Sequence, residues 1–268
     1  MSLPHAHSFE TPEAIHALID IGVGEIVVMA VDTTRTSVEV RPAREGRRND
    51  IDQAEGTTVT FADGRLGIKA PKQRLLGLLG RPGAVIVTVE LPSGSDVEAT
   101  AGVGDIEIAG TVHRCRARTQ AGDVRVEDAE VLEAQSSAGD VMAGRAGASA
   151  TLQSLAGGVR LEEVTGTARI KSSAGEVELG TVAGEVTATA PYGQVRVRRA
   201  VSGSLNLTTS YADIEVGIPE GTAARLDVST EHGRIRNELT SSGVPSEGLE
   251  RVLVEAHTSY GSITVRRP

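Results

Sequence analysis

The sequence predicts an all-β protein, a β-solenoid or β-roll built from stacked two-stranded coils of about 18 residues. Three observations support this prediction: a glycine that recurs at a nearly fixed spacing, alternating apolar residues after each glycine, and very few aromatic side chains. The spacings are 18, 17, 18, 18 and 18 residues, between Gly104, Gly122, Gly139, Gly157, Gly175 and Gly193. A short fixed period indicates structural units that contact only their neighbours.

The composition agrees with such a stack. Of the 268 residues, 39% are hydrophobic, only 2% are aromatic, and none is Trp. We therefore expect a core of Val, Ile, Leu, Ala and Thr side chains, which suit a pleated sheet. The net charge of −9 offers no positive field for phosphate backbones, so we expect no nucleic-acid partner.

The N-terminal part differs from the rest and is predicted to be an antiparallel β cap over residues 1–92. Its alternating runs are separated by longer, charged loops, at 17–31, 37–40, 57–61, 66–68 and 85–91. A cap is expected because an open stack exposes unpaired strand edges. An early copy of the repeat, GEIVV at Gly24, lies in the first run. We expect one domain over 1–268, in which the solenoid occupies 93–268.

Each solenoid coil is expected to hold two strands of about five residues joined by two tight turns. Two apolar columns recur once per coil, starting at Cys115 and Ala117, and the residues between them are mostly polar. This alternation places one side of each strand inward. One turn contains the repeat glycine, which can adopt a positive φ. The other turn contains an apolar column made of Ala129, Ala146, Val164, Val182 and Val201.

Two more columns follow the same period. The middle residues of the strands after the glycines alternate in charge, which predicts parallel stacking in register: Arg160, Glu178, Arg196, Glu215 and Arg236. The residue before the glycine is Ala in four consecutive coils and then becomes aromatic, at Tyr192, Tyr211, His232 and Tyr260. The edge of the stack therefore changes toward the C-terminus, where a polar insertion, 238–250, separates the last two coils.

Acidic residues near the repeat glycines are the first candidates for chemistry: Asp105, Asp123, Asp140, Glu176, Glu185 and Asp213. Such a row is either a solvated edge that discourages strand pairing or a calcium site built from oxygen ligands. Calcium-binding β-rolls use a Gly-Gly-x-Gly-x-Asp pattern, which this chain lacks. Paired carboxylates could also serve a glycosidase, but the scarcity of aromatic platforms argues against one. We expect no catalytic, cofactor-binding or metal-binding residues.

One segment, PKQRLLGLLGRPG over 71–83, breaks the strand pattern. Its leucines either cover the stack or form an exposed patch for self-association or a protein partner, and this possible interaction loop comprises Leu75, Leu76, Leu78 and Leu79. The single cysteine, Cys115, lies on the inward side of its strand and is expected to be a small buried hydrophobe.

Several blocks of the repeat resemble the bacterial "putative adhesin" family, a β-strand-repeat domain of unknown function: ELPSGSDVEATAGVGDIEI, SSAGDV, SSAGEVEL and TSYADIEV. The resemblance covers about residues 85–265. It implies a β-solenoid or β-roll fold and no catalytic constellation. Many relatives look exported or membrane-anchored, whereas this chain shows neither a basic and apolar signal sequence nor an apolar run that could span a bilayer. We therefore expect a cytoplasmic protein.

Together, the repeat and the resemblance predict a non-enzymatic β-solenoid interaction or scaffold module that binds an unknown protein partner or a second copy of itself. One alternative is a self-assembling, filament-like structural protein. The other is a carbohydrate-active β-helix enzyme, which would need a deep pocket with paired carboxylates.

Overall fold

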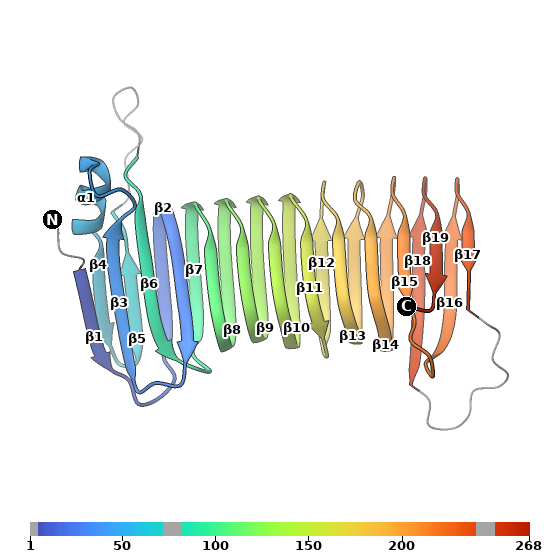
Figure 1. Ribbon diagram of the computed structural model, residues 1–268, viewed down its shortest axis with the longest axis horizontal. Helices are drawn as coiled ribbons and strands as arrows, with labels where there is room; N and C mark the ends of the chain where they lie inside the picture. The colour runs from blue at the N-terminus through green and yellow to red at the C-terminus, as the bar shows by residue number, and fades with distance from the viewer. Residues whose placement is uncertain (1–4, 72–81, 240–249) are drawn as a thin grey trace. The chain divides into compact units, whose positions relative to one another are not determined.

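A computed structural model describes residues 5–71, 82–239 and 250–268. Its elements are almost entirely β-strands (Figure 1), which confirms the all-β prediction. The chain divides into two compact units, residues 1–130 and 131–268. The expectation of a single domain over 1–268 stays a prediction.

Unit 1 contains the N-terminal strands, one helix and the first regular coils. Its elements are β1 (His5–Glu10), β2 (His16–Val31), β3 (Arg35–Pro42), α1 (Arg48–Glu55), β4 (Thr58–Ala62), β5 (Arg65–Lys69), β6 (Val85–Pro92), β7 (Asp96–Val103), β8 (Ile106–Ala121) and the first half of β9 (Val124–Ala138).

The central strand of unit 1 is β2. It pairs in parallel with β7, Ala17 opposite Val97, and with β8, Ile26 opposite Ile106. Strands β5 and β6 also run parallel to it. The segment that carries the early GEIVV copy is therefore a coil of the stack, although it lies inside the range predicted to be the cap.

The antiparallel pairs of the predicted cap lie beyond β5 and β6, on the side of β2 opposite β7 and β8. Strand β3 pairs antiparallel with β1 and β6, and β4 pairs antiparallel with β5. Helix α1 lies in a stretch where the sequence predicted only a charged loop. Its buried face consists of Asp50, Gln53 and Ala54, and Asp50 Oδ1 accepts a hydrogen bond from the backbone N of Ala84 at 3.0 Å. Because this face is mostly polar, hydrophobic periodicity could not indicate the helix.

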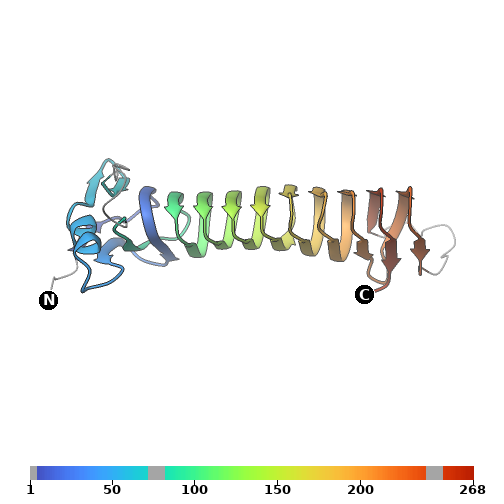
Figure 2. The same cartoon turned by 90° about the horizontal axis from the view of Figure 1, so that it is seen from above.

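Unit 2 consists of stacked coils (Figure 2). Its elements are the second half of β9, then β10 (Val141–Ala156), β11 (Val159–Val164), β12 (Thr167–Ser172), β13 (Val177–Ala190), β14 (Val195–Thr209), β15 (Ile214–Gly217), β16 (Ala223–Thr230), β17 (Ile235–Asn237), β18 (Arg251–Thr258) and β19 (Ile263–Arg266).

Neighbouring coils of unit 2 pair in parallel and in register, as predicted. Val159 lies opposite Val177, and Val177 lies opposite Val195. The first half of β13 pairs with β11 and its second half pairs with β12, so several coils consist of one long bent strand rather than two short ones. Both predicted apolar columns are buried in each unit, including Cys115, Leu132, Leu152, Ile170 and Leu205. These side chains form a thin aliphatic core.

The repeat glycines are required mainly because consecutive coils approach closely. Gly122 has a positive φ of 139°, as the turn prediction requires. Gly175 has no such φ, but a Cβ atom there would lie 2.1 Å from the carbonyl oxygen of Gly157 in the preceding coil. Any side chain at this position would force the two backbones apart.

The last two coils do not stack in sequence order. Strand β18 pairs with β14 on one side and β16 on the other, and β19 lies in the same way between β15 and β17 (Figure 1). The inward row of β19 is fully apolar, with Ile263 and Val265, whereas β17 offers Ile235 and the polar Asn237. The more apolar coil occupies the interior position, where it is covered on both sides.

The structure corrects two predicted columns. A register shift after Val182 leaves Ala200 buried in the turn column and Val201 half-buried outside it, because the coil from Gly193 to Ala212 has one extra residue. Thr264, rather than Glu215, is the partner of Arg236. The charge alternation therefore ends at Glu215.

Candidate functional site

Four exposed aromatic residues of unit 2 form a continuous stack at one turn, here called the tyrosine ladder: Tyr192, Tyr211, Tyr260 and His232. The ring centroids of Tyr192 and Tyr211 are 5.4 Å apart with planes 4° from parallel, and those of Tyr211 and Tyr260 are 5.4 Å apart with planes at 5°. His232 stacks on Tyr260 at 4.8 Å and 20°. The spatial order follows the coils, so His232 is last although it precedes Tyr260 in sequence.

In-register pairing explains the ladder. Residues at equivalent turn positions lie one coil apart, and parallel strands are spaced about 4.8 Å, close to the separation that offset aromatic stacking favours. The three tyrosines of the ladder are all the tyrosines of the chain, which has no Trp. The sequence identified this column, but neither its order nor the stacking.

The ladder is open to solvent. The tyrosines are 68%, 59% and 53% exposed, in the order Tyr192, Tyr211 and Tyr260. Among the described residues, none of their hydroxyl groups has a hydrogen-bond partner. Stacking accounts for the parallel rings, but it leaves the polar ends of three tyrosines available to a ligand.

A shallow depression begins at the first ring of the ladder. It is lined by Ala174, Gly175, Glu176, Tyr192, Gly193, Gln194, Tyr211, Ala212 and Asp213. Tyr192 is covered on one face by Tyr211, while the preceding coil has only Ala174 at the equivalent position. The depression therefore lies where the residue at this turn position changes from the small Ala174 to the aromatic Tyr192 in the next coil.

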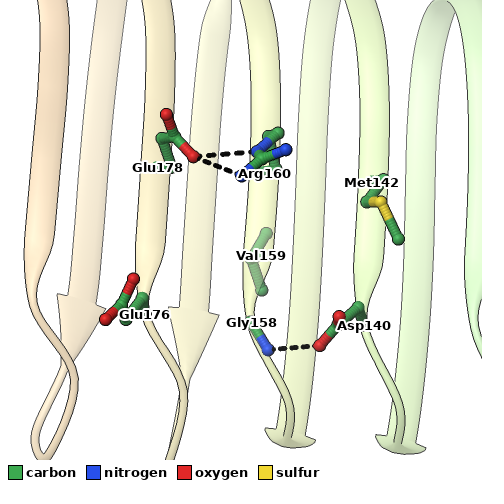
Figure 3. Close-up of a pocket in the computed structure, with 7 residues that line it drawn as sticks. All are labelled: Asp140, Met142, Gly158, Val159, Arg160, Glu176 and Glu178. Atoms are coloured by element: carbon green, nitrogen blue, oxygen red, sulfur yellow. Dashed lines mark hydrogen bonds and ion pairs between the residues drawn. The ribbon is translucent and has the colours of Figure 1, made fainter.

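A second depression adjoins the first at Glu176 (Figure 3). It lies where Gly158 provides no side chain between Asp140 and Glu176, and Met142 and Val159 contribute its apolar lining. On its rim, Arg160 Nη2 lies 2.6 Å from Glu178 Oε2. Figure 3 shows Glu176 apart from this ion pair, and its carboxylate has no partner among the described residues.

Three carboxylates of the predicted acidic row, Asp105, Asp140 and Asp213, bind the backbone of the next coil. Asp105 Oδ1 accepts a hydrogen bond from the N–H of Asp123 at 2.8 Å, Asp140 Oδ1 from Gly158 at 2.8 Å, and Asp213 Oδ1 from Ser262 at 2.7 Å. Glu185 does not belong to this row, because it pairs with Thr167 on the other half of its coil. Within the described ranges, no group of three or more His, Cys, Asp or Glu residues is arranged to hold a metal ion.

The sequence reasoning missed a buried hydroxyl column at the glycine turn. Ser154 Oγ donates to the carbonyl oxygen of Gly139 at 2.8 Å, and Ser172 Oγ donates to that of Gly157 at 2.9 Å. Equivalent bonds are made by Thr119, Thr209, Thr230 and Thr258. A Ser or Thr three residues before the glycine was the available signal. These hydroxyls supply a hydrogen-bond donor to carbonyl groups that are at least partly buried.

Two other sequence predictions concern single features. Cys115 is buried, as predicted, and burial raises the pKa of its thiol to about 12, so it stays protonated at neutral pH. The possible interaction loop, Leu75, Leu76, Leu78 and Leu79, lies outside the described residues. In the part of the chain that the structure describes, no helix is long and apolar enough to cross a membrane.

Solved structures that match the chain come from several bacteria. One from Bacteroides fragilis, described as a "putative adhesin", is 13% identical, covers 100% of this chain and 98% of its own, and has a TM-score of 0.37. Another from Parabacteroides distasonis, described as a "putative lipid binding protein", is 10% identical over 98% of this chain and 97% of its own, with a TM-score of 0.38. No curated protein matches the chain.

The sequence model of one family, Toastrack DUF4097, matches residues 19–266. This range includes most of β2 and the C-terminal coil β18–β19, so the match spans nearly all of both units. The chain belongs to the Toastrack DUF4097 family.

Proposed function

We propose that the protein is a non-enzymatic binding module whose recognition surface is the tyrosine ladder of unit 2. The observation that supports this proposal most strongly is the concentration of all three tyrosines, each more than half exposed, in one ordered stack. Tyrosine supplies a large contact area at low conformational cost, and it is enriched at sites where proteins bind other molecules.

The groups that could carry chemistry have structural roles that fit a binding module better than an enzyme. Asp105, Asp140 and Asp213 cap backbone amides, and the Cys115 thiol is buried and neutral. Each ring of the ladder stacks on a neighbour, and the coils that carry Tyr192, Tyr211 and Tyr260 are paired on both sides. A preorganised surface loses little entropy on binding. Self-assembly into a filament remains the alternative prediction.

Intrinsic fluorescence can test the ladder directly. Because the chain has three tyrosines and no tryptophan, tyrosine emission reports on the ladder alone. We expect at least one member of a panel of neutral oligosaccharides, basic peptides, acidic peptides and phospholipid vesicles to change this emission in a saturable way. Tyr211→Ala, which interrupts the ladder at its centre, should weaken that binding by about tenfold, the scale of an aromatic hot spot.

The matched control is Leu155→Ala, which removes an exposed apolar side chain of unit 2 outside the ladder, 43% exposed in the native protein. It should bind like the native protein. If the whole panel leaves tyrosine emission unchanged, or if Leu155→Ala weakens binding as much as Tyr211→Ala, the ladder is not the recognition surface.

A further inference from the structure

We propose that the open face of Tyr192 and the carboxylate of Glu176 form a site for a guanidinium group, supplied by an arginine in a basic segment of a partner protein. The inference rests on the proposed function, since it names the ligand of the ladder.

Only one tyrosine of the ladder presents a free ring face. Tyr211 lies between Tyr192 and Tyr260, and Tyr260 lies between Tyr211 and His232, so both faces of these two rings are covered. Tyr192 has a ring on one side only. On its other side Ala174 is too small to cover a phenol ring, and Tyr192 is accordingly the most exposed of the three. The open face has room for one planar group.

The charge beside this face is negative. Glu176 lines the same depression as Tyr192, is exposed, and has no partner among the described residues. Asp213 also lines it, with one carboxylate oxygen engaged by Ser262. Two arginines near the start of the adjoining strands are paired elsewhere, Arg160 with Glu178 and Arg196 with Glu215. No lysine or arginine lines the depression itself.

An aromatic face and a carboxylate both attract a cation. The face of an aromatic ring carries the negative part of its quadrupole, so a cation placed over Tyr192 is stabilised while an anion is repelled. Guanidinium fits better than ammonium, because it is planar, stacks on the ring and donates two parallel hydrogen bonds to a carboxylate. The net charge of −9 would also attract a basic segment over a longer range.

Binding of a fluorescein-labelled oligoarginine peptide, followed by anisotropy and by tyrosine emission at low salt, tests this assignment. Glu176→Gln should weaken binding about two- to fivefold, the scale of one exposed ion pair or cation–π contact. Tyr192→Ala should weaken it by a similar factor, whereas Tyr192→Phe retains the ring face and should bind within about twofold of the native protein. An oligolysine peptide of equal length should bind more weakly than oligoarginine.

The matched control is Glu185→Gln, which removes the same charge from an exposed residue of β13 that does not line the depression. It separates a local site from general attraction between a basic peptide and an acidic protein. The melting temperature of each variant shows whether the fold is retained, and Glu176→Gln leaves the whole ladder in place.

The outcomes distinguish this inference from the proposed function. Equal weakening by Glu176→Gln and Glu185→Gln, or undiminished oligoarginine binding to Tyr192→Ala, would overturn the guanidinium site. If a neutral oligosaccharide or phosphocholine vesicles change tyrosine emission while oligoarginine does not, the ladder binds a ligand of another class and only this inference fails. If no ligand changes the emission, both fail.

Discussion

At the scale of single residues, buried hydroxyls close the glycine turns. Ser172 is fully buried; its Oγ donates to Gly157 O at 2.9 Å and accepts from Gly175 N at 2.9 Å. Ser172→Ala leaves both partly buried backbone groups without that partner, and should lower the free energy of unfolding by about 1–3 kcal/mol in urea denaturation. Ser173→Ala is the control, because the Ser173 hydroxyl has no hydrogen-bond partner among the described residues. This substitution should lower the free energy of unfolding by less than about 0.5 kcal/mol. Equal costs would contradict the assigned role.

At the scale of secondary-structure elements, side-chain ion pairs across β11, β13 and β14 help to fix their register. Glu178 binds Arg160 on one side and lies 3.6 Å from Arg198 Nε on the other. Glu178→Arg would place three arginines in neighbouring strands, and should destabilise unit 2 by about 1 kcal/mol and lower the melting temperature. Glu185→Arg, which faces the neutral Thr167 and Ser204, should change the melting temperature less. An unchanged melting curve for Glu178→Arg would argue against the in-register ladder.

At the scale of the whole molecule, the order of the coils differs from the order of the chain. Val254 in β18 is fully buried between β14 and β16, whereas Val228 in β16 belongs to a coil paired on one side and is only half-buried. Replacing valine by alanine should therefore lower the free energy of unfolding by about 2 kcal/mol at Val254 and by less than about 1 kcal/mol at Val228. Urea denaturation of the two variants measures both changes. Stacking in sequence order would reverse this ranking, because β18–β19 would then be the outermost coil.

The sequence by itself determined the repeating architecture, because period and alternation are local properties of the chain. The glycine spacing, the inward columns that include Cys115 and Ala168, and the aromatic column that begins at Tyr192 are all visible without a structure. The family resemblance agrees with the Toastrack DUF4097 match, which shows the fold but names no ligand. A partner and a cytoplasmic location stay predictions.

Only the tertiary structure decided which coils are neighbours and what the polar columns do. Coils with the same period present similar edges, so the local pattern could not place β18–β19 ahead of β16–β17 or locate the extra residue at Val201. Helix α1 could not be predicted from hydrophobic periodicity, because its buried face is mostly polar. The open face of Tyr192 likewise depends on its neighbours, Tyr211 and Ala174. The coil order and the open face of Tyr192 arise from contacts between coils, and a repeat specifies its own coil more strongly than the coil beside it.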